Sequence, residues 1–85
     1  MKLKAYRVVV DGWPASAGIY ASTHAAGAKY AAWLGFTDAG YRATFIEFMK
    51  LLIVRRAPEH DELMGREKPG KCYSEEFIRY KHEQQ

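Results

Sequence analysis

Cysteine, long apolar runs and an excess of one charge are all nearly missing from this sequence. A single thiol, Cys72, cannot form an internal disulfide, so the chain is not a disulfide-stapled secreted scaffold. The first residues lack the apolar segment of a signal peptide, and no stretch approaches the ~20 apolar residues that a membrane-spanning helix needs. We therefore expect a protein that works in the cytoplasm and does not engage a membrane.

The charge balance is mild, with 13 Lys and Arg against 10 Asp and Glu and a net charge of +3. Proteins dedicated to nucleic-acid binding usually concentrate positive charge, because each neutralised phosphate releases counterions. Here acidic residues interrupt the basic ones along most of the chain. Net charge alone therefore gives little support to a nucleic-acid partner.

Groups that could carry catalysis are few: Cys72, His24, His60 and His82. A cysteine nucleophile needs a base within hydrogen-bonding distance, and no spacing here is typical of one. Three scattered histidines and one thiol do not have the close spacing of a zinc site, and the glycines form neither a P-loop nor a dinucleotide fingerprint. We expect no enzymatic activity, no metal and no cofactor.

Core-forming residues, by contrast, are plentiful. The 85 residues are 48% apolar and include twelve aromatic side chains, which is too hydrophobic for a disordered chain. This length suits one domain and not two. The sequence predicts a single α+β domain over residues 1–85.

The first part of the chain predicts a hairpin. Residues 2–10 alternate between two faces, as a strand does, and Asp11-Gly12 is a strong turn signal. Pro14 keeps the following residues irregular, so we expect a loop of more than minimal length before a second short strand at 18–22. Trp13 should lie at the tip of this hairpin.

The most legible segment is alanine-rich and predicts a long helix over residues 24–39. Ser22 or Thr23 can cap its start by accepting a backbone hydrogen bond. Gly40 should end it in the left-handed conformation, with Tyr41 packing back on the last turn.

A second, short helix should begin at Phe45, because Thr44 and Glu47 have the spacing of a capping box. Residues 52–54 are rich in β-branched side chains and predict a third strand that Pro58 terminates.

The polar residues 58–73 predict a loop, and Ser74 should open a C-terminal helix. The order is therefore β-β-α-α-β-α, with a small three-stranded sheet, one long helix packed on it, a short second helix and a C-terminal helix. If the second and third strands are parallel neighbours, their crossover is right-handed.

Residues 4–62 carry a resemblance. The sequence contains Gly40-Tyr41, Thr44-Phe45 and the string Val-Arg-Arg-Ala-Pro-Glu-His-Asp at 54–61. This run resembles small, mostly uncharacterised proteins encoded by bacteriophages and prophages. The resemblance implies no particular chemistry. It implies an accessory phage product in a bacterial cytoplasm, and such products often bind and block host proteins, defence nucleases among them.

Two sets of residues are candidates for binding. If residues 52–56 form a strand, Arg55 and Arg56 point to opposite faces, so a basic cluster needs the following loop to fold back. The candidate nucleic-acid contacts are Arg42, Arg55, Arg56, Lys68 and Lys71.

The long helix supplies the second set. The side chains expected to pack on the sheet are Ala26, Tyr30, Trp33, Leu34 and Thr37, so that Trp33 is buried between helix and sheet. The opposite side carries a seam of small residues that would let another helix approach closely: Ala28, Ala32, Gly35 and Ala39.

Three covers for this seam stay open: the C-terminal helix through Phe77 and Tyr80 or Lys81, a second copy of the chain, or a target protein. The leading hypothesis is a non-enzymatic, phage-encoded protein-binding module that inhibits or modulates a host protein, such as a defence protein, by steric blocking. The alternative is a small nucleic-acid-binding accessory protein.

Overall fold

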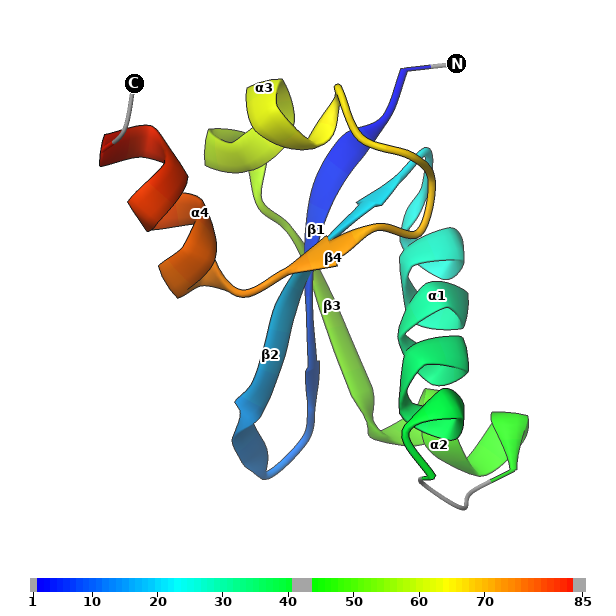
Figure 1. Ribbon diagram of the computed structural model, residues 1–85. Helices are drawn as coiled ribbons and strands as arrows, with labels where there is room; N and C mark the ends of the chain where they lie inside the picture. The colour runs from blue at the N-terminus through cyan, green and yellow to red at the C-terminus, as the bar shows by residue number, and fades with distance from the viewer. Residues whose placement is uncertain (1, 41–43, 84–85) are drawn as a thin grey trace.

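An antiparallel sheet with helices on both faces forms the centre of the computed structural model, which describes residues 2–40 and 44–83 (Figure 1). Its elements in chain order are β1 (Lys4–Val10), β2 (Trp13–Ser22), α1 (Ala25–Asp38), α2 (Phe45–Leu51), β3 (Leu52–Arg56), the 3-10 helix η1 (Pro58–His60), α3 (Asp61–Met64), β4 (Cys72–Tyr73) and α4 (Glu75–Glu83). The strand order is β3-β1-β2-β4. The α+β class is confirmed, and the sheet has four strands where the sequence predicts three.

The β1–β2 hairpin is tighter than expected. Val10 pairs with Trp13, so Asp11 and Gly12 alone form the turn, and Gly12 has the positive φ of +79° that this turn requires. The register shifts between Val8 and Val10, where the Val10 N–H donates to Ser16 Oγ at 2.8 Å. This side-chain acceptor replaces a lost backbone partner. The irregular residues therefore lie within β2 as a bulge and not in a longer loop.

The last two strands were the harder part to predict. β3 pairs antiparallel with β1, with Val8 opposite Val54, and it is not a parallel neighbour of β2. The predicted loop over 58–73 contains η1, α3 and β4, and β4 is held to β2 by the pairing of Ile19 with Tyr73. A two-residue strand has no periodicity of its own, so only its distant partner defines it.

Helix starts depend on single side chains. His24, and neither Ser22 nor Thr23, caps α1: the Gly27 N–H donates to His24 Nδ1 at 2.8 Å. Ser22 is occupied instead by the His24 backbone, since Ser22 Oγ donates to the His24 carbonyl at 2.8 Å.

The other caps follow the sequence. Gly40 has a φ of +95°, as predicted for the end of α1, while Tyr41 lies outside the described residues. Thr44 Oγ1 accepts the Glu47 N–H at 3.2 Å, which confirms the forward half of the capping box at α2.

The sheet has a separate core on each face. Alternating side chains of β1 divide between the two: Tyr6 and Val8 belong to one and Ala5 to the other. The first core packs against α1 and α2 and contains Tyr6, Val8, Val10, Tyr20, Ala28, Ala32, Phe48 and Leu52. The second packs against α3 and α4 and contains Ala5, Ile19, Ala21, Ala57, Met64 and Ile78.

The predicted orientation of α1 is wrong. Ala28 and Ala32 are fully buried in the first core, whereas Tyr30 and Leu34 are exposed. Small side chains let the helix backbone approach the sheet closely, and this contact replaces the expected burial of large ones. Trp33 is only partly buried and meets Phe45 of α2 edge-on, with ring centroids 5.2 Å apart.

The C-terminal helix does not cover the seam. α4 buries Ile78 in the second core, on the face of the sheet opposite to α1 (Figure 1). A bidentate ion pair fastens it there, since Arg7 Nε and one terminal nitrogen each donate to the Glu75 carboxylate at 2.8 Å. Phe77 and Tyr80 are therefore on the wrong side of the molecule to contact α1.

Candidate protein-binding surface

The predicted seam is not one surface. Ala28 and Ala32 are already covered by the chain's own sheet, so no partner can reach them without unfolding α1. Gly35 and Ala39 are exposed near the end of the helix. The seam as predicted for partner binding is therefore divided between the core and the surface.

The exposed large side chains of α1 and α2 form a different surface, which we call the α1–α2 surface. Its members are Tyr30, Leu34, Phe45 and Ile46, which are 50%, 46%, 43% and 69% exposed. Ring contacts join the two helices, with 6.2 Å between the centroids of Tyr30 and Phe45. The aromatic and aliphatic groups therefore lie on neighbouring helices of one face of the molecule.

Local structure fixes these side chains in place. Phe48 anchors α2 in the first core, where it is fully buried and packs against Phe36 of α1 at 5.3 Å between centroids. Because Phe48 points inward and Thr44 sets the start of the helix, Phe45 and Ile46 occupy the exposed first turn. The sequence contains this signal, two apolar residues directly after a cap, but the prediction did not use it.

Charged groups are sparse on this surface. The first turn of α1 has no acidic residue and its last turn has no basic one. The charged residues of the two helices are Lys29 and Asp38 in α1, and Glu47 and Lys50 in α2. Exposed helix faces are normally polar, so an uncharged outer side with large apolar groups is unusual for a surface that contacts only water.

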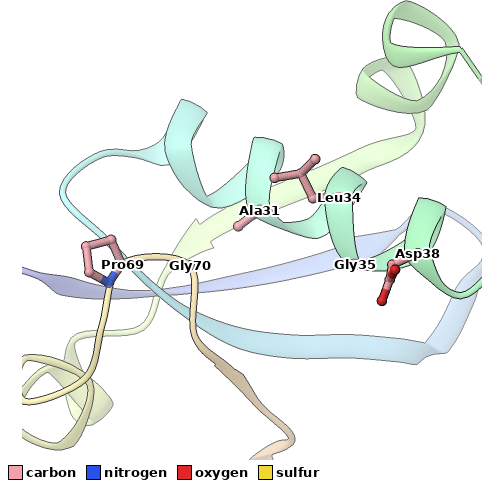
Figure 2. Close-up of a pocket in the computed structure, with 6 residues that line it drawn as sticks. All are labelled: Ala31, Leu34, Gly35, Asp38, Pro69 and Gly70. Atoms are coloured by element: carbon pink, nitrogen blue, oxygen red, sulfur yellow. The ribbon is translucent and has the colours of Figure 1, made fainter.

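A hollow of about 550 Å³ lies along α1 beside the turn at Pro69-Gly70. Leu34 and Asp38, four residues apart on α1, both line it, and Figure 2 shows Ala31 directed toward Pro69. The hollow continues toward the start of α1, where Thr23 and His24 line it. It borders the α1–α2 surface at Leu34.

The structure does not bring the predicted nucleic-acid contacts together. Arg55 and Arg56 lie on β3 and Lys71 directly precedes β4, and these strands are the two outer edges of the sheet. Arg56 is also engaged, because its guanidinium donates to both oxygens of Asp61 at 2.8 and 2.6 Å.

The two remaining contacts add little to a basic cluster. Lys68 is exposed in the segment before β4, and the predicted Arg42 lies outside the described residues. The predicted fold-back of the loop does occur, at Pro69-Gly70, but it meets α1 and not β3.

The side chains considered for catalysis take part in the packing and hydrogen bonding of the fold. Cys72 is an exposed residue, but desolvation of its thiol raises the pKa of that group, so the sulfur stays protonated and a poor nucleophile at neutral pH. His24 caps α1, and His60 Nε2 lies 3.7 Å from Glu75 Oε2. Within residues 2–40 and 44–83, no group of three or more His, Cys, Asp or Glu side chains is placed to hold a metal ion.

The pair of Arg7 and Glu75 was missed by sequence reasoning. The two residues are 68 positions apart, and no local pattern connects them. Arg7 lowers the pKa of the Glu75 carboxyl through its hydrogen bonds, which keeps the pair charged. Its position between β1 and α4 gives it a structural role.

Comparison with known proteins adds no relative: no family model, curated protein or solved structure matches this chain. The resemblance to phage proteins stays a prediction. Among the helices that the structure describes, none is long and apolar enough to cross a bilayer.

Proposed function

We propose that this chain is a non-enzymatic protein-binding module that uses its α1–α2 surface to cover part of another protein. The observation that carries the proposal is the exposure of Tyr30, Leu34, Phe45 and Ile46 on two helices that contact each other through Tyr30 and Phe45 and have few charges. Centres of protein interfaces are enriched in aromatic residues and depleted of charge. A surface of this composition gains free energy when a partner removes it from water.

The partner's nature follows from the resemblance to phage-encoded proteins. The proposed target is a host protein, such as a defence protein, and the mechanism is steric blocking of a surface that the target needs. The rigid attachment of both helices supports this mechanism, because the buried Ala28, Ala32 and Phe48 fix α1 and α2 to the sheet. Little conformational entropy is then lost on binding.

Nucleic-acid binding, the second hypothesis, receives less support from the geometry. Its cations are divided between opposite edges of the sheet, and Arg56 is neutralised by Asp61. Phosphate binding gains affinity when several cations follow one groove. A protein partner is therefore the better-supported reading.

Affinity co-purification of the tagged chain from bacterial lysate tests the proposal. We expect a host protein in stoichiometric yield, and we expect Ile46→Glu to abolish its recovery, because the change places a charge on the apolar surface that the partner covers. Ile46 is exposed, so the variant should melt like the parent.

Tyr80→Glu is the matched control. Tyr80 is 57% exposed on α4, across the sheet from α1, and the substitution adds the same charge in place of a large apolar group. Its recovery of the partner should equal that of the parent. Absence of any stoichiometric partner across plausible hosts, or equal loss with both variants, would contradict the proposal.

A further inference from the structure

The hollow beside α1 has an apolar lining and one ionised side chain. Ala31, Leu34, Gly35, Pro69 and Gly70 form most of its wall, and Asp38 stands at the end nearest the C-terminus of the helix (Figure 2). Its volume of about 550 Å³ is sufficient for one or two side chains of a bound peptide.

Among the residues that the structure describes, none neutralises the negative charge at the Asp38 end of the hollow. Asp38 is the last residue of α1, where the helix dipole already presents partial negative charge, and the last turn contains no basic residue. Within the described part of the chain, Asp38 forms no ion pair. An acidic residue at this end of a helix is unfavourable by itself, so a cation from outside would relieve it.

At the opposite end of α1, one of the donors that could attract an acidic ligand is already engaged. The Gly27 N–H, one of the free donors at the start of the helix, is already bonded to His24 Nδ1. Charge complementarity therefore favours a basic group at Asp38.

The packing of the described residues does not explain why position 35 is a glycine. A Cβ at Gly35 would have no atom of the described residues within 4 Å, although glycine inside a helix costs about 0.5–1 kcal/mol relative to alanine. At Gly27 a Cβ would lie 2.5 Å from Ser22 Oγ, so that glycine is required by the chain itself. Of Gly27 and Gly35, only Gly35 leaves room on the surface of α1, and this room is part of the hollow.

We propose that this hollow binds a peptide segment of the partner, with an apolar side chain between Leu34 and Pro69 and a Lys or Arg beside Asp38. The inference rests on the proposed protein-binding function and names the chemistry of the segment that is bound. In this proposal the α1–α2 surface provides apolar contact area for affinity, and the hollow provides specificity for a partner segment that contains a basic residue.

Selection from a library of random twelve-residue peptides against the full chain tests the proposal. We expect enriched peptides to share an apolar residue followed or preceded closely by Lys or Arg. A synthetic copy of one of them should bind Asp38→Asn about tenfold more weakly than the parent, since a charged contact is lost. Gly35→Leu should weaken binding at least as much by filling the hollow.

A charge exchange separates direct contact from general electrostatics. Asp38→Lys should lose the selected peptide and bind its Lys→Glu or Arg→Glu counterpart instead. Ala26→Leu, on an exposed part of α1 outside the lining, is the control and should leave affinity unchanged. Thermal melting of each variant verifies that it is folded.

Three results would overturn the inference: no enriched peptide, enriched peptides without a basic residue, or equal binding to the parent, Asp38→Asn and Gly35→Leu. None of these affects the co-purification that Ile46→Glu disrupts. Absence of any protein that co-purifies with the parent chain, with intact peptide selection, would instead remove the proposed function. The two failures are therefore distinguishable.

Discussion

The two glycines inside α1 predict opposite effects of the same substitution. Gly35→Ala should raise the free energy of unfolding by about 0.5–1 kcal/mol, because the new methyl group has open space and alanine favours helix. Gly27→Ala should lower it, because the methyl group would meet Ser22 Oγ and the His24 ring that caps the helix. Urea unfolding of both variants measures the difference. Stabilisation by both changes would contradict the described start of α1.

Asp61 predicts a dependence of stability on pH. Its carboxylate accepts hydrogen bonds from Arg56 and from the Ala5 N–H at 2.8 Å, and the Arg56 bonds are the main cause that lowers its pKa to about 2. A lowered pKa stabilises the folded state above the unfolded value of about 3.9, and this contribution disappears as pH falls toward 2.

Asp61→Asn should therefore be less stable than the parent at pH 7, and the difference should shrink between about pH 4 and pH 2. The loss should be modest, since the Asp61 side chain is 31% exposed and solvent screens the pair. Urea unfolding of both proteins across this pH range gives the comparison. A difference that is constant with pH would show that the ion pair contributes nothing.

Among the elements, α1 shows what the sequence could predict and what it could not. Its extent was predicted over residues 24–39 and is Ala25–Asp38, because alanine content and Gly40 are local signals. Its orientation was predicted wrongly because both sides of the helix are uncharged. Periodicity then cannot distinguish a face of small residues that packs closely from a face of large ones.

The attachment of α2 to the first core depends on one fully buried side chain, Phe48. Phe48→Ala should cost about 3–5 kcal/mol, the range for a fully buried aromatic residue. Trp33→Ala should cost clearly less than Phe48→Ala, because Trp33 is only partly buried and its main ring contacts are with Tyr30 and Phe45. Thermal or urea unfolding of both variants measures which loss of stability is larger. The reverse order would restore the predicted burial of Trp33.

The elements after Pro58 were beyond sequence reasoning for a physical reason. η1 and α3 contain three and four residues, too few to display a period, and β4 exists only through its ladder with β2. The C-terminal helix was predicted from Ser74, and Ser74 Oγ does accept the Phe77 N–H at 3.2 Å. Its place across the sheet from α1 depends on Arg7 and Ile78, which no local pattern connects.

At the scale of the whole molecule, the two faces of the sheet are covered by different helices. One face holds α3 and α4 through Ile78 and the Arg7–Glu75 pair, and the other holds α1 and α2 with their large apolar side chains outward (Figure 1). The sequence predicted an uncharged helix surface available to a partner, but it placed that surface on the side that packs against the sheet.

Hydrogen–deuterium exchange of the chain, alone and bound to the protein that co-purifies with it, tests the central claim most directly. Amides of α1 and α2 should exchange more slowly in the complex, while those of α4 should be unchanged, because the partner covers Tyr30, Leu34, Phe45 and Ile46. Protection confined to α4 or β3, with α1 and α2 unchanged, would contradict the account.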